Sequence, residues 1–335
     1  MKVAEMGEFA LIELLRQTLA PAAAVAGQKQ LVLGIGDDAA AWRGDPSIQM
    51  ATVDCLVQDV HFTNADATWQ EIGEKAIAVN LSDIAAMGGL PRYALVALTL
   101  PGDMAAEDVV ALYRGMLRQT EHFGVTIVGG NISRAPLVSI TVTIIGHSGT
   151  PERPVMMRSA ANIGDAIAVT GYPGTAAAGR AMLKEKLHLG PDAGDLLRRA
   201  FLTPCPRIPE GRLLVNLGIH AAIDISDGLL ADLGHICRSS GVGACLHLPR
   251  LPVRDEVRAA FGTRALDFAL WGGEDYELLF TGPPALLERA RKESDYPITI
   301  MGEITGTAAG EIVLLDEKGK VVTPRQKGWD HFAPA

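Results

Sequence analysis

Apolar and polar positions in the first half of the chain alternate between helical and strand periods. Apolar residues recur at helical spacing over residues 8–19, and longer helices are predicted over Trp69–Met87 and residues 105–123. Runs rich in apolar and β-branched residues predict five strands, at Leu31–Ile35, Ile48–Val53, Tyr93–Leu100, Val125–Val128 and Leu137–Ile145.

A stretch rich in Gly, Thr and Pro, His147–Pro154, ends this pattern and predicts a domain boundary between residues 149 and 150. Beyond it, helices are predicted near residues 174–188, 193–202, 208–217 and 228–239. Strands are predicted at residues 165–170, 222–225, 243–248, 276–280 and 297–301, with a final hairpin over residues 311–322. Because both halves alternate strands and helices, we expect an α/β fold with α+β layers, divided into residues 1–149 and 150–335.

Composition narrows the class of protein. The 335 residues carry 39 acidic and 30 basic side chains, a formal charge of −9, so a basic surface for duplex nucleic acid is not expected. No apolar run approaches the roughly 20 residues of a membrane span, and the acidic N-terminal segment does not resemble a signal peptide. The four cysteines form no C-x-x-C pair, which predicts reduced thiols and a cytoplasmic protein.

Acidic residues recur in short segments that also contain Gly, Ser or small apolar residues. These segments are Gly36-Asp37-Asp38-Ala39, Val53-Asp54, Asp59-Val60-His61, Ser82-Asp83-Ile84, Asp224-Ile225-Ser226-Asp227-Gly228 and Gly272-Gly273-Glu274-Asp275-Tyr276. A carboxylate beside a buried strand is costly unless it is paired or bound to metal, and Mg²⁺ prefers oxygen ligands together with substrate phosphates. Each segment taken alone is also explained by a helix cap or a turn. Their recurrence favours a site for several Mg²⁺ ions and a phosphate substrate.

Other phosphate-binding motifs fit the chain poorly. The segment Gly34–Ala39 has the spacing of a dinucleotide-binding turn, but its two acids would repel a pyrophosphate and no suitable helix follows. The P-loop, the protein-kinase signature set, G-x-S-x-G and H-E-x-x-H are absent from the sequence. The glycine pairs at residues 129–130 and 272–273 are either turns or places where backbone approaches a phosphate. Two basic side chains, His61 and Arg158, are either phosphate contacts or ordinary surface residues.

In this order the motifs resemble those of the thiamine-monophosphate kinase family. The resemblance extends from Gly7-Glu8-Phe9 to Gly328-Trp329-Asp330-His331-Phe332 and is most specific at Asn80-Leu81-Ser82-Asp83 and Gly273-Glu274-Asp275-Tyr276. It implies an aminoimidazole ribonucleotide synthetase-like architecture, in which an N-terminal domain binds ATP and Mg²⁺ and forms a homodimer. A C-terminal α/β domain would complete the active site. The implied reaction transfers the γ-phosphoryl group of ATP to thiamine phosphate, the last step of thiamine diphosphate biosynthesis.

The resemblance also implies a role for individual residues. The implied Mg²⁺ ligands are Asp38, Thr52, Asp54, Asp83, Asn131, Asp224 and Asp227, with Asp37 as a weaker candidate. The implied ATP contacts are Gly130, Asn131, Arg158 and Ser226, and the implied thiamine phosphate contacts are His61, Glu274 and Trp329. No general base is expected, because the acceptor phosphate is already a nucleophile at neutral pH and catalysis can rest on positioning and charge neutralisation.

Two positions depart from the family pattern. Asn131 stands where the family commonly has Asp, and Val53 stands where it commonly has Thr, so one metal site loses a charge and the other loses a side-chain oxygen. These departures leave room for a non-catalytic protein that binds Mg-nucleotide on the same scaffold. A metal-dependent phosphatase would share the clustered acids, and selenophosphate synthetase would need an N-terminal reactive cysteine, whereas the first cysteine here is Cys55.

Overall fold

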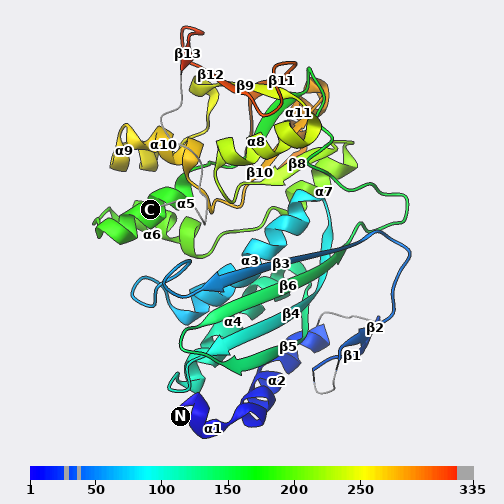
Figure 1. The fold of residues 1–335 in the computed structure, drawn as a ribbon, viewed down its shortest axis with the longest axis vertical. Coiled ribbons are helices and arrows are strands. Elements are labelled where there is room, and N and C mark those ends of the chain that lie inside the picture. Colours follow the sequence, from blue (N-terminus) through cyan, green and yellow to red (C-terminus); the bar gives the residue numbers. More distant parts are fainter. Residues whose placement is uncertain (26–29, 36–38, 323–335) are drawn as a thin grey trace. The chain divides into compact units, whose positions relative to one another are not determined.

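The computed structural model describes residues 1–25, 30–35 and 39–322, which form two compact units (Figure 1). One unit comprises Met1–Ile84 and Leu90–Arg153, and the other comprises Ala85–Gly89 and the chain from Pro154 onward. All four cysteines lie in the described part and carry free thiols, as the sequence predicted. None of the helices in these ranges has the length and apolar character needed to cross a membrane.

A four-stranded sheet in the order β3-β6-β4-β5 forms the centre of the first unit. Its strands are β3 (Gln49–Val57), β4 (Leu90–Leu100), β5 (Thr126–Arg134) and β6 (Ser139–His147). The pair β4 and β5 is parallel, and the other two pairs are antiparallel. The helices α3 (Trp69–Ala86) and α4 (Ala106–Phe123) lie along one face of this sheet (Figure 1), and α2 (Glu8–Val25) packs on α4 and β5.

The two faces of this sheet differ sharply in burial. Along β6, Ile140, Val142 and Ile144 are fully buried, whereas the residues between them are partly exposed. Side chains alternate between faces along a strand, so the buried set defines an inner face toward the helices and leaves an outer face open. The exposed outer-face residues include Val53, Cys55, Ala97 and Asn131.

Two glycines allow α3 and α4 to pack closely together. A Cβ atom at Gly73 would overlap the carbonyl oxygen of Leu112, and one at Gly115 would overlap the carbonyl oxygen of Gln70. Because each helix presents a glycine to the backbone of the other, no larger residue fits at either position without separating the helices.

A short segment at the margin of the first unit holds a partly buried ion pair. The segment follows a two-stranded sheet formed by β1 (Leu31–Leu33) and β2 (Ala41–Trp42). The remaining helix of the first unit is α1 (Val3–Met6), at the start of the chain. Arg92 Nη1 lies 2.6 Å from Asp45 Oδ2, and both side chains are less than one-fifth exposed, at 19% and 18%. Hydrogen bonds from Ser47 and Arg92 hold the pKa of Asp45 well below its usual range.

The second unit is built on a seven-stranded sheet in the order β13-β12-β9-β11-β7-β10-β8. All neighbouring strands are antiparallel except β9 and β12, which are parallel. The strands are β7 (Ala166–Thr170), β8 (Ala221–Asp224), β9 (Gly243–His247), β10 (Leu278–Gly282), β11 (Ile298–Thr305), β12 (Ile312–Leu315) and β13 (Val321–Val322). The last two strands form the hairpin predicted over residues 311–322.

Helices pack on the central strands of this sheet and bury a continuous apolar core. Ile167, Ile223, Leu233 and Leu279 are at most 2% exposed and join strands β7, β8 and β10 to helix α8. The helices are α5 (Thr175–Glu185), α6 (Pro191–Leu202), α7 (Ile208–Asn216), α8 (Leu229–Ser240), α9 (Asp255–Phe261), α10 (Arg264–Trp271) and α11 (Pro284–Glu293), with a 3-10 turn at Leu248–Arg250.

The predicted fold class of α/β with α+β layers is confirmed, but two strand limits were wrong. Strand β3 continues to Val57 instead of ending at Val53, and β5 continues to Arg134 instead of ending at Val128. The glycine pair that suggested a turn lies inside β5, where a Cβ atom at Gly130 would overlap the carbonyl oxygen of Val96 in β4. The close approach of β4 therefore explains Gly130 without a break in the strand.

Candidate functional site

In the first unit, two predicted metal ligands meet between β3 and α3. The hydroxyl of Thr52 donates a hydrogen bond to Asp83 Oδ2. Thr52 points to the inner face of the sheet, toward α3, and both residues are only partly exposed. The fold therefore places a hydroxyl and a carboxylate, two hard oxygen donors, side by side.

Asp54 lies on the same face as Thr52, two residues further along β3. Its backbone N–H donates to Asn80 Oδ1 at 2.9 Å, and Asn80 Nδ2 in turn donates to the carbonyl of Ala76 at 3.0 Å. Asn80 is fully buried, and its side-chain amide therefore fixes the position of Asp54 in β3 relative to helix α3. The sequence motif contained Asn80 but gave it no role, and the structure identifies it as the residue that sets the spacing between Asp54 and Asp83.

Asn131 is not brought together with these residues inside the first unit. The register across the sheet pairs Asn131 with Ala97, Ala97 with Thr141 and Thr141 with Cys55, and residues paired in this way share a face. The Asn131 amide donates to the hydroxyl of Ser133 at 3.0 Å. Asn131 therefore belongs to the outer face, opposite the side chains of Thr52 and Asp54.

His61 lies in the turn that follows β3 and has a defined ring orientation. Its ring Nδ1 accepts the backbone N–H of Val57 at 3.0 Å, and the backbone N–H of His61 donates to the carbonyl of Val57 at 2.9 Å. With Nδ1 acting as an acceptor, the proton of the neutral ring is on Nε2, which can donate to a phosphate oxygen. Two other predicted site residues, Asp38 and Trp329, lie outside the described residues, as does the weaker candidate Asp37.

In the second unit, three predicted site residues follow closely along the chain: Asp224 is the last residue of β8, and Ser226 and Asp227 lie in the loop between β8 and α8. One oxygen of Asp232, in the first turn of α8, accepts the backbone N–H groups of three consecutive residues. The bonds from Ser226 and Asp227 measure 3.2 Å, and the bond from Gly228 measures 3.1 Å. Asp232 is 1% exposed, so this carboxylate acts as a buried clamp that gives the loop its shape.

Negative charge is concentrated around this loop. Burial raises the pKa of Asp232 to about 8, and the charges of Asp224 and Asp227 add to the increase. Ligand atoms of Asp227, Asp232 and His235 lie within 4.8 Å of one another. The pKa of His235 is lowered by burial first, then by the charge of Arg238 and then by that of Arg158. Arg158 therefore lies close enough to this loop for its positive charge to act on His235. The loop therefore combines carboxylates that suit a divalent cation with an arginine that suits a phosphate.

The segment that contains Glu274 is bonded directly to this loop. The N–H of Glu274 donates to the carbonyl of Ser226 at 2.8 Å, and the N–H of Tyr276 donates to the carbonyl of Ile225 at 2.9 Å. Glu274 and Tyr276 have φ angles of +65° and +52°, in the left-handed region that non-glycine residues seldom adopt. A Cβ atom at Gly273 would overlap the carbonyl oxygen of Ser226, so this glycine permits the close pairing of two loops. That contact explains Gly273 without a bound phosphate.

A second buried carboxylate anchors the Glu274 segment on its other side. Asp275 Oδ2 accepts the N–H of Gly174 at 2.6 Å, and its Oδ1 accepts the N–H of Ala176 at 3.0 Å, both at the N-terminus of α5. Burial raises the pKa of Asp275 to about 8, and these two N–H bonds act in the opposite direction. The sequence offered one signal for each: Asp232 is an acid in an otherwise apolar segment, and Asp275 follows the glycine pair at residues 272–273. It did not identify their backbone partners.

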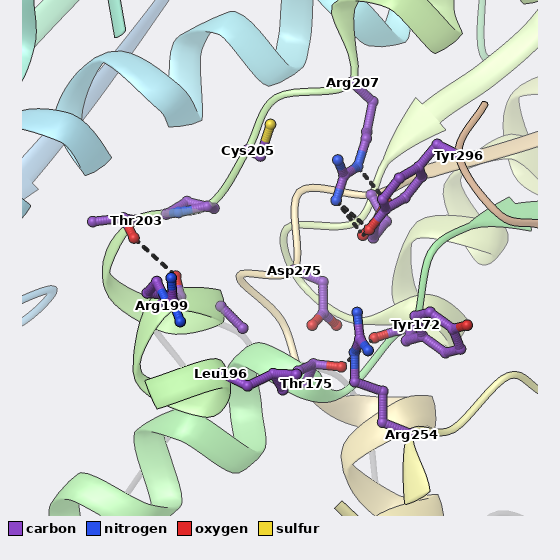
Figure 2. A pocket seen from close by; sticks show the side chains of 13 residues that line it. Tyr172, Thr175, Leu196, Arg199, Thr203, Cys205, Arg207, Arg254, Asp275 and Tyr296 are labelled. Carbon is purple, nitrogen blue, oxygen red and sulfur yellow. Dashed lines mark hydrogen bonds and ion pairs between the residues drawn. The ribbon is translucent and has the colours of Figure 1, made fainter. Parts of the chain in front are cut away.

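A cavity of about 200 Å³ opens beside Asp275 within the second unit (Figure 2). Polar side chains surround it, including Tyr172, Thr175, Arg199, Thr203, Cys205, Arg207, Arg254, Asp275, Glu277 and Tyr296. One wall is a buried ion pair in which Arg207 Nε and Nη2 lie 2.7 and 2.8 Å from the two oxygens of Glu277. Glu277 also accepts hydrogen bonds from the hydroxyls of Thr170 and Tyr296, at 2.6 and 3.0 Å.

Comparison with known proteins gives consistent matches along the chain. The family model for AIR synthase related protein, N-terminal domain, matches residues 36–148, and the model for its C-terminal domain matches residues 162–314. A thiamine-monophosphate kinase of Aquifex aeolicus (strain VF5) is 37% identical over 336 residues, which covers 99% of this chain and 100% of that protein.

Solved structures agree with these sequence matches. The thiamine-monophosphate kinase from Stenotrophomonas maltophilia K279a superposes with a TM-score of 0.81 at 33% identity, covering 94% of this chain and 98% of that chain. The structure of AaThiL complexed with AMPPCP and TMP superposes with a TM-score of 0.75, also at 33% identity, and covers 99% of both chains. These matches confirm the resemblance that the sequence motifs indicated.

Proposed function

Since this chain belongs to the thiamine-monophosphate kinase family, we propose that it transfers the γ-phosphoryl group of ATP to thiamine phosphate, forming thiamine diphosphate and ADP. The observation that carries the proposal is the match to such a kinase over 99% of the chain. A relative of similar coverage was solved with AMPPCP, an analogue of ATP, together with TMP, which fits a two-substrate reaction.

The residues of the second unit suit this reaction. An oxygen of the acceptor phosphate attacks the γ-phosphorus, and the bond to the β-phosphate oxygen breaks as ADP leaves. No side chain has to remove a proton from a strong acid, so the protein contributes alignment and charge balance. The loop from Asp224 to Gly228 is clamped by Asp232 and bonded to Glu274, and it can therefore hold a nucleotide contact and an acceptor contact in fixed relation.

We include Mg²⁺ in the proposal because the described candidate ligands are oxygen donors. They are Thr52, Asp54, Asp83 and Asn131 in the first unit and Asp224 and Asp227 in the second. When bound, Mg²⁺ supplies positive charge that neutralises the phosphates of ATP and the acceptor. The carboxylate of Asp83 already accepts a hydrogen bond from Thr52, and the mutual repulsion of Asp224, Asp227 and Asp232 is of the kind that a cation relieves.

We further propose that two copies of the chain associate through the outer face of the first unit's sheet. This face exposes apolar side chains, among them Val53 on the edge strand β3, which is 59% exposed. A second copy would cover them, and would also bury Asn131, which the family resemblance assigns to metal and ATP. Val53→Lys is expected to convert a dimer to a monomer in sedimentation equilibrium. A wild-type chain that sediments as a monomer at micromolar concentration would contradict this part of the proposal.

We also propose that the two units contribute different contacts to the active site and that the protein is cytoplasmic. The first unit supplies ATP and Mg²⁺ contacts and the dimer surface, and the second supplies its own ATP contacts, Arg158 and Ser226, with the acceptor contact Glu274. The division at residues 149 and 150 and the roles of Asp38, Gly130, His61 and Trp329 stay predictions. A cytoplasmic location is supported by the four free thiols, since secreted proteins commonly pair their cysteines.

The direct test is to incubate the purified protein with thiamine phosphate and Mg·ATP and to separate the thiamine species after oxidation to fluorescent thiochromes. We expect thiamine diphosphate to form only when ATP is present. Bound ATP without product would favour a non-catalytic nucleotide-binding protein, and ATP-independent release of thiamine would favour a phosphatase. Either result would refute the proposed kinase activity.

A matched pair of variants tests the site itself. Asp224→Ala should abolish most turnover with little change in thermal stability, and Asp83→Ala should do the same in the first unit. The control is Asp165→Asn, because Asp165 is buried in the second unit and accepts the N–H of Asn162 at 2.8 Å, away from the site. Near-normal turnover by folded Asp224→Ala or Asp83→Ala protein would remove these residues from the proposed metal set.

A further inference from the structure

The cavity beside Asp275 lies on the side of the 272–276 segment that faces away from the loop at residues 224–228. The Asp275 carboxylate accepts N–H groups at the N-terminus of α5. The neighbouring residues, Glu274 and Tyr276, instead donate their N–H groups to the carbonyls of residues 226 and 225. None of the 13 residues that line the cavity is a candidate metal ligand or a predicted nucleotide or acceptor contact (Figure 2). A molecule bound in this cavity would therefore be additional to the two substrates.

The lining of the cavity carries an excess of positive charge. Three arginines line it, Arg199, Arg207 and Arg254, together with two acids, Asp275 and Glu277. Glu277 is compensated by its bidentate ion pair with Arg207. Asp275 is compensated by the two N–H groups at the start of α5. The charges of Arg199 and Arg254 are therefore left without a counter-charge in the lining.

Arg199 and Arg254 make no ion pair with an acid in the part of the chain that the structure describes. The guanidinium of Arg254 lies over the ring of Tyr172, 4.2 Å from its centroid. Arg199 Nε donates to the backbone carbonyl of Asp195, at 3.3 Å. A guanidinium presents its N–H groups as a planar fork that matches the two oxygens of a carboxylate, and the contact with Tyr172 leaves the edge of the Arg254 plane available.

The two free guanidinium groups belong to different elements and reach different sides of the cavity. Arg199 is part of α6, and Arg254 immediately precedes α9. Figure 2 shows Arg199 beside Thr203 at one margin and Arg254 beside Tyr172 at the other, with Leu196 between them. A ligand with a single anionic group would pair with one arginine and leave the other unpaired. The arrangement therefore matches a molecule that is anionic at both ends.

The size and the apolar part of the lining limit the body of such a molecule. Leu196, Ala200 and Pro204 line the cavity and offer no side-chain hydrogen bond, so they suit a short hydrocarbon chain. A volume of about 200 Å³ is smaller than the roughly 300–1,000 Å³ of sites for drug-sized ligands. The occupant that fits both features is a small molecule with two carboxylates on a short carbon chain.

We propose that this cavity binds a short dicarboxylate, with one carboxylate on Arg254 and the other on Arg199. The site is separate from those of ATP and thiamine phosphate, so it does not depend on the proposed kinase activity. Because Asp275 forms part of the wall, the bound molecule lies against the residue that anchors Glu274 to α5.

The test is a calorimetric titration of the full-length protein with malonate, succinate and glutarate at constant ionic strength, since salt screens exposed charges. Butyrate is the matched ligand control, because it has the chain length of succinate but only one carboxylate. We expect at least one dicarboxylate to bind once per chain, and butyrate to bind at least about tenfold more weakly than succinate. Arg254→Gln and Arg199→Gln should each raise the Kd for the dicarboxylate by a similar factor. Arg258→Gln removes the same charge from a residue of α9 that does not line the cavity, and it should bind like the wild type.

Competition shows whether the site is separate. Thiamine phosphate and Mg·ATP should not displace the dicarboxylate, whether or not the protein forms thiamine diphosphate, and displacement by either would overturn the proposal. Inorganic phosphate that binds through the two arginines more tightly than any dicarboxylate would overturn the assigned ligand class. The proposal also fails if the wild type binds none of the three dicarboxylates, or if the folded arginine variants bind them equally well. Because Arg199 is exposed, Arg199→Gln keeps the test decisive even if Arg254→Gln does not fold.

Discussion

The buried pair of Arg207 and Glu277 should be one of the most sensitive points of the second unit. Its side chains are only 12% and 7% exposed, and the guanidinium also lies 3.6 Å from the ring centroid of Tyr296. Removing one member of such a pair leaves a buried charge and costs about 3–5 kcal/mol of unfolding free energy. In Arg207→Met protein the hydroxyls of Thr170 and Tyr296 still donate to Glu277, so we expect a loss near the lower end, about 3 kcal/mol.

An exposed ion pair in the same unit provides the control. Arg264 and Glu185 also form a bidentate contact, but their side chains are 49% and 40% exposed, and such pairs contribute about 0–1 kcal/mol. Arg264→Met should therefore change stability by less than about 1 kcal/mol. The assay is hydrogen exchange of β10 amides under increasing urea, which follows the opening of the second unit alone.

A double variant separates the two explanations of the loss. If an unpaired charge is the cause, Arg207→Met combined with Glu277→Leu should recover much of the stability, because an apolar pair of similar volume carries no desolvation cost. Equal losses in Arg207→Met and Arg264→Met, or a double variant no more stable than the single one, would refute the reasoning.

Three further changes test other parts of the structure. Gly73→Ala should destabilise the first unit by about 1–3 kcal/mol in urea unfolding, because the new methyl group meets the carbonyl of Leu112. Asp232→Ala should speed hydrogen exchange at residues 226–228 and raise the Mg²⁺ concentration needed for half-maximal turnover, whereas unchanged exchange would deny its role as a clamp. Asp45→Asn should be less stable than the wild type at pH 7, and the difference should be smaller at pH 3, because the lowered pKa of Asp45 gives stability that is fully present above its ordinary pKa of about 4 and is lost as the pH falls toward the lower pKa of the folded protein. An equal gap at both pH values would contradict this assignment.

The sequence predicted the elements of the fold well and their limits less well. Helix α3 was predicted from a long, mostly apolar run, and the final hairpin from the turn residues Lys318 and Gly319. Helix α4 was predicted from its residue pattern, which needs no knowledge of neighbouring elements. The ends of β3 and β5 were missed because Asp54 and the glycine pair at residues 129–130 look like turn residues when the adjacent strands are unknown. Only the pairing with β4 explains why a glycine is required in the middle of β5.

The candidate site was predictable at the level of motifs but not of contacts. The acids at Asp83, Asp224 and Asp227 were marked by their apolar surroundings, since a carboxylate in such a place needs a partner or a metal. The partners themselves were not visible, because Asn80 and Asp232 act on backbone N–H groups, which every residue has and which leave no pattern in the sequence. The face of Asn131 was also hidden, because it depends on the register of four strands.

Gly273 belongs to a sequence motif and also makes a contact that only the structure shows. Residues 224–228 and 272–276 are far apart along the chain, yet Gly273 lies against the carbonyl of Ser226 and allows Glu274 to bond to it. On their outer sides the two loops are held by buried carboxylates, Asp232 on α8 and Asp275 on α5. A motif rich in glycine and acids can therefore be required by the packing of two loops as much as by any ligand. In this unit the packing of the two segments determines the positions of Glu274 and residues 224–228, and therefore where substrates can contact them.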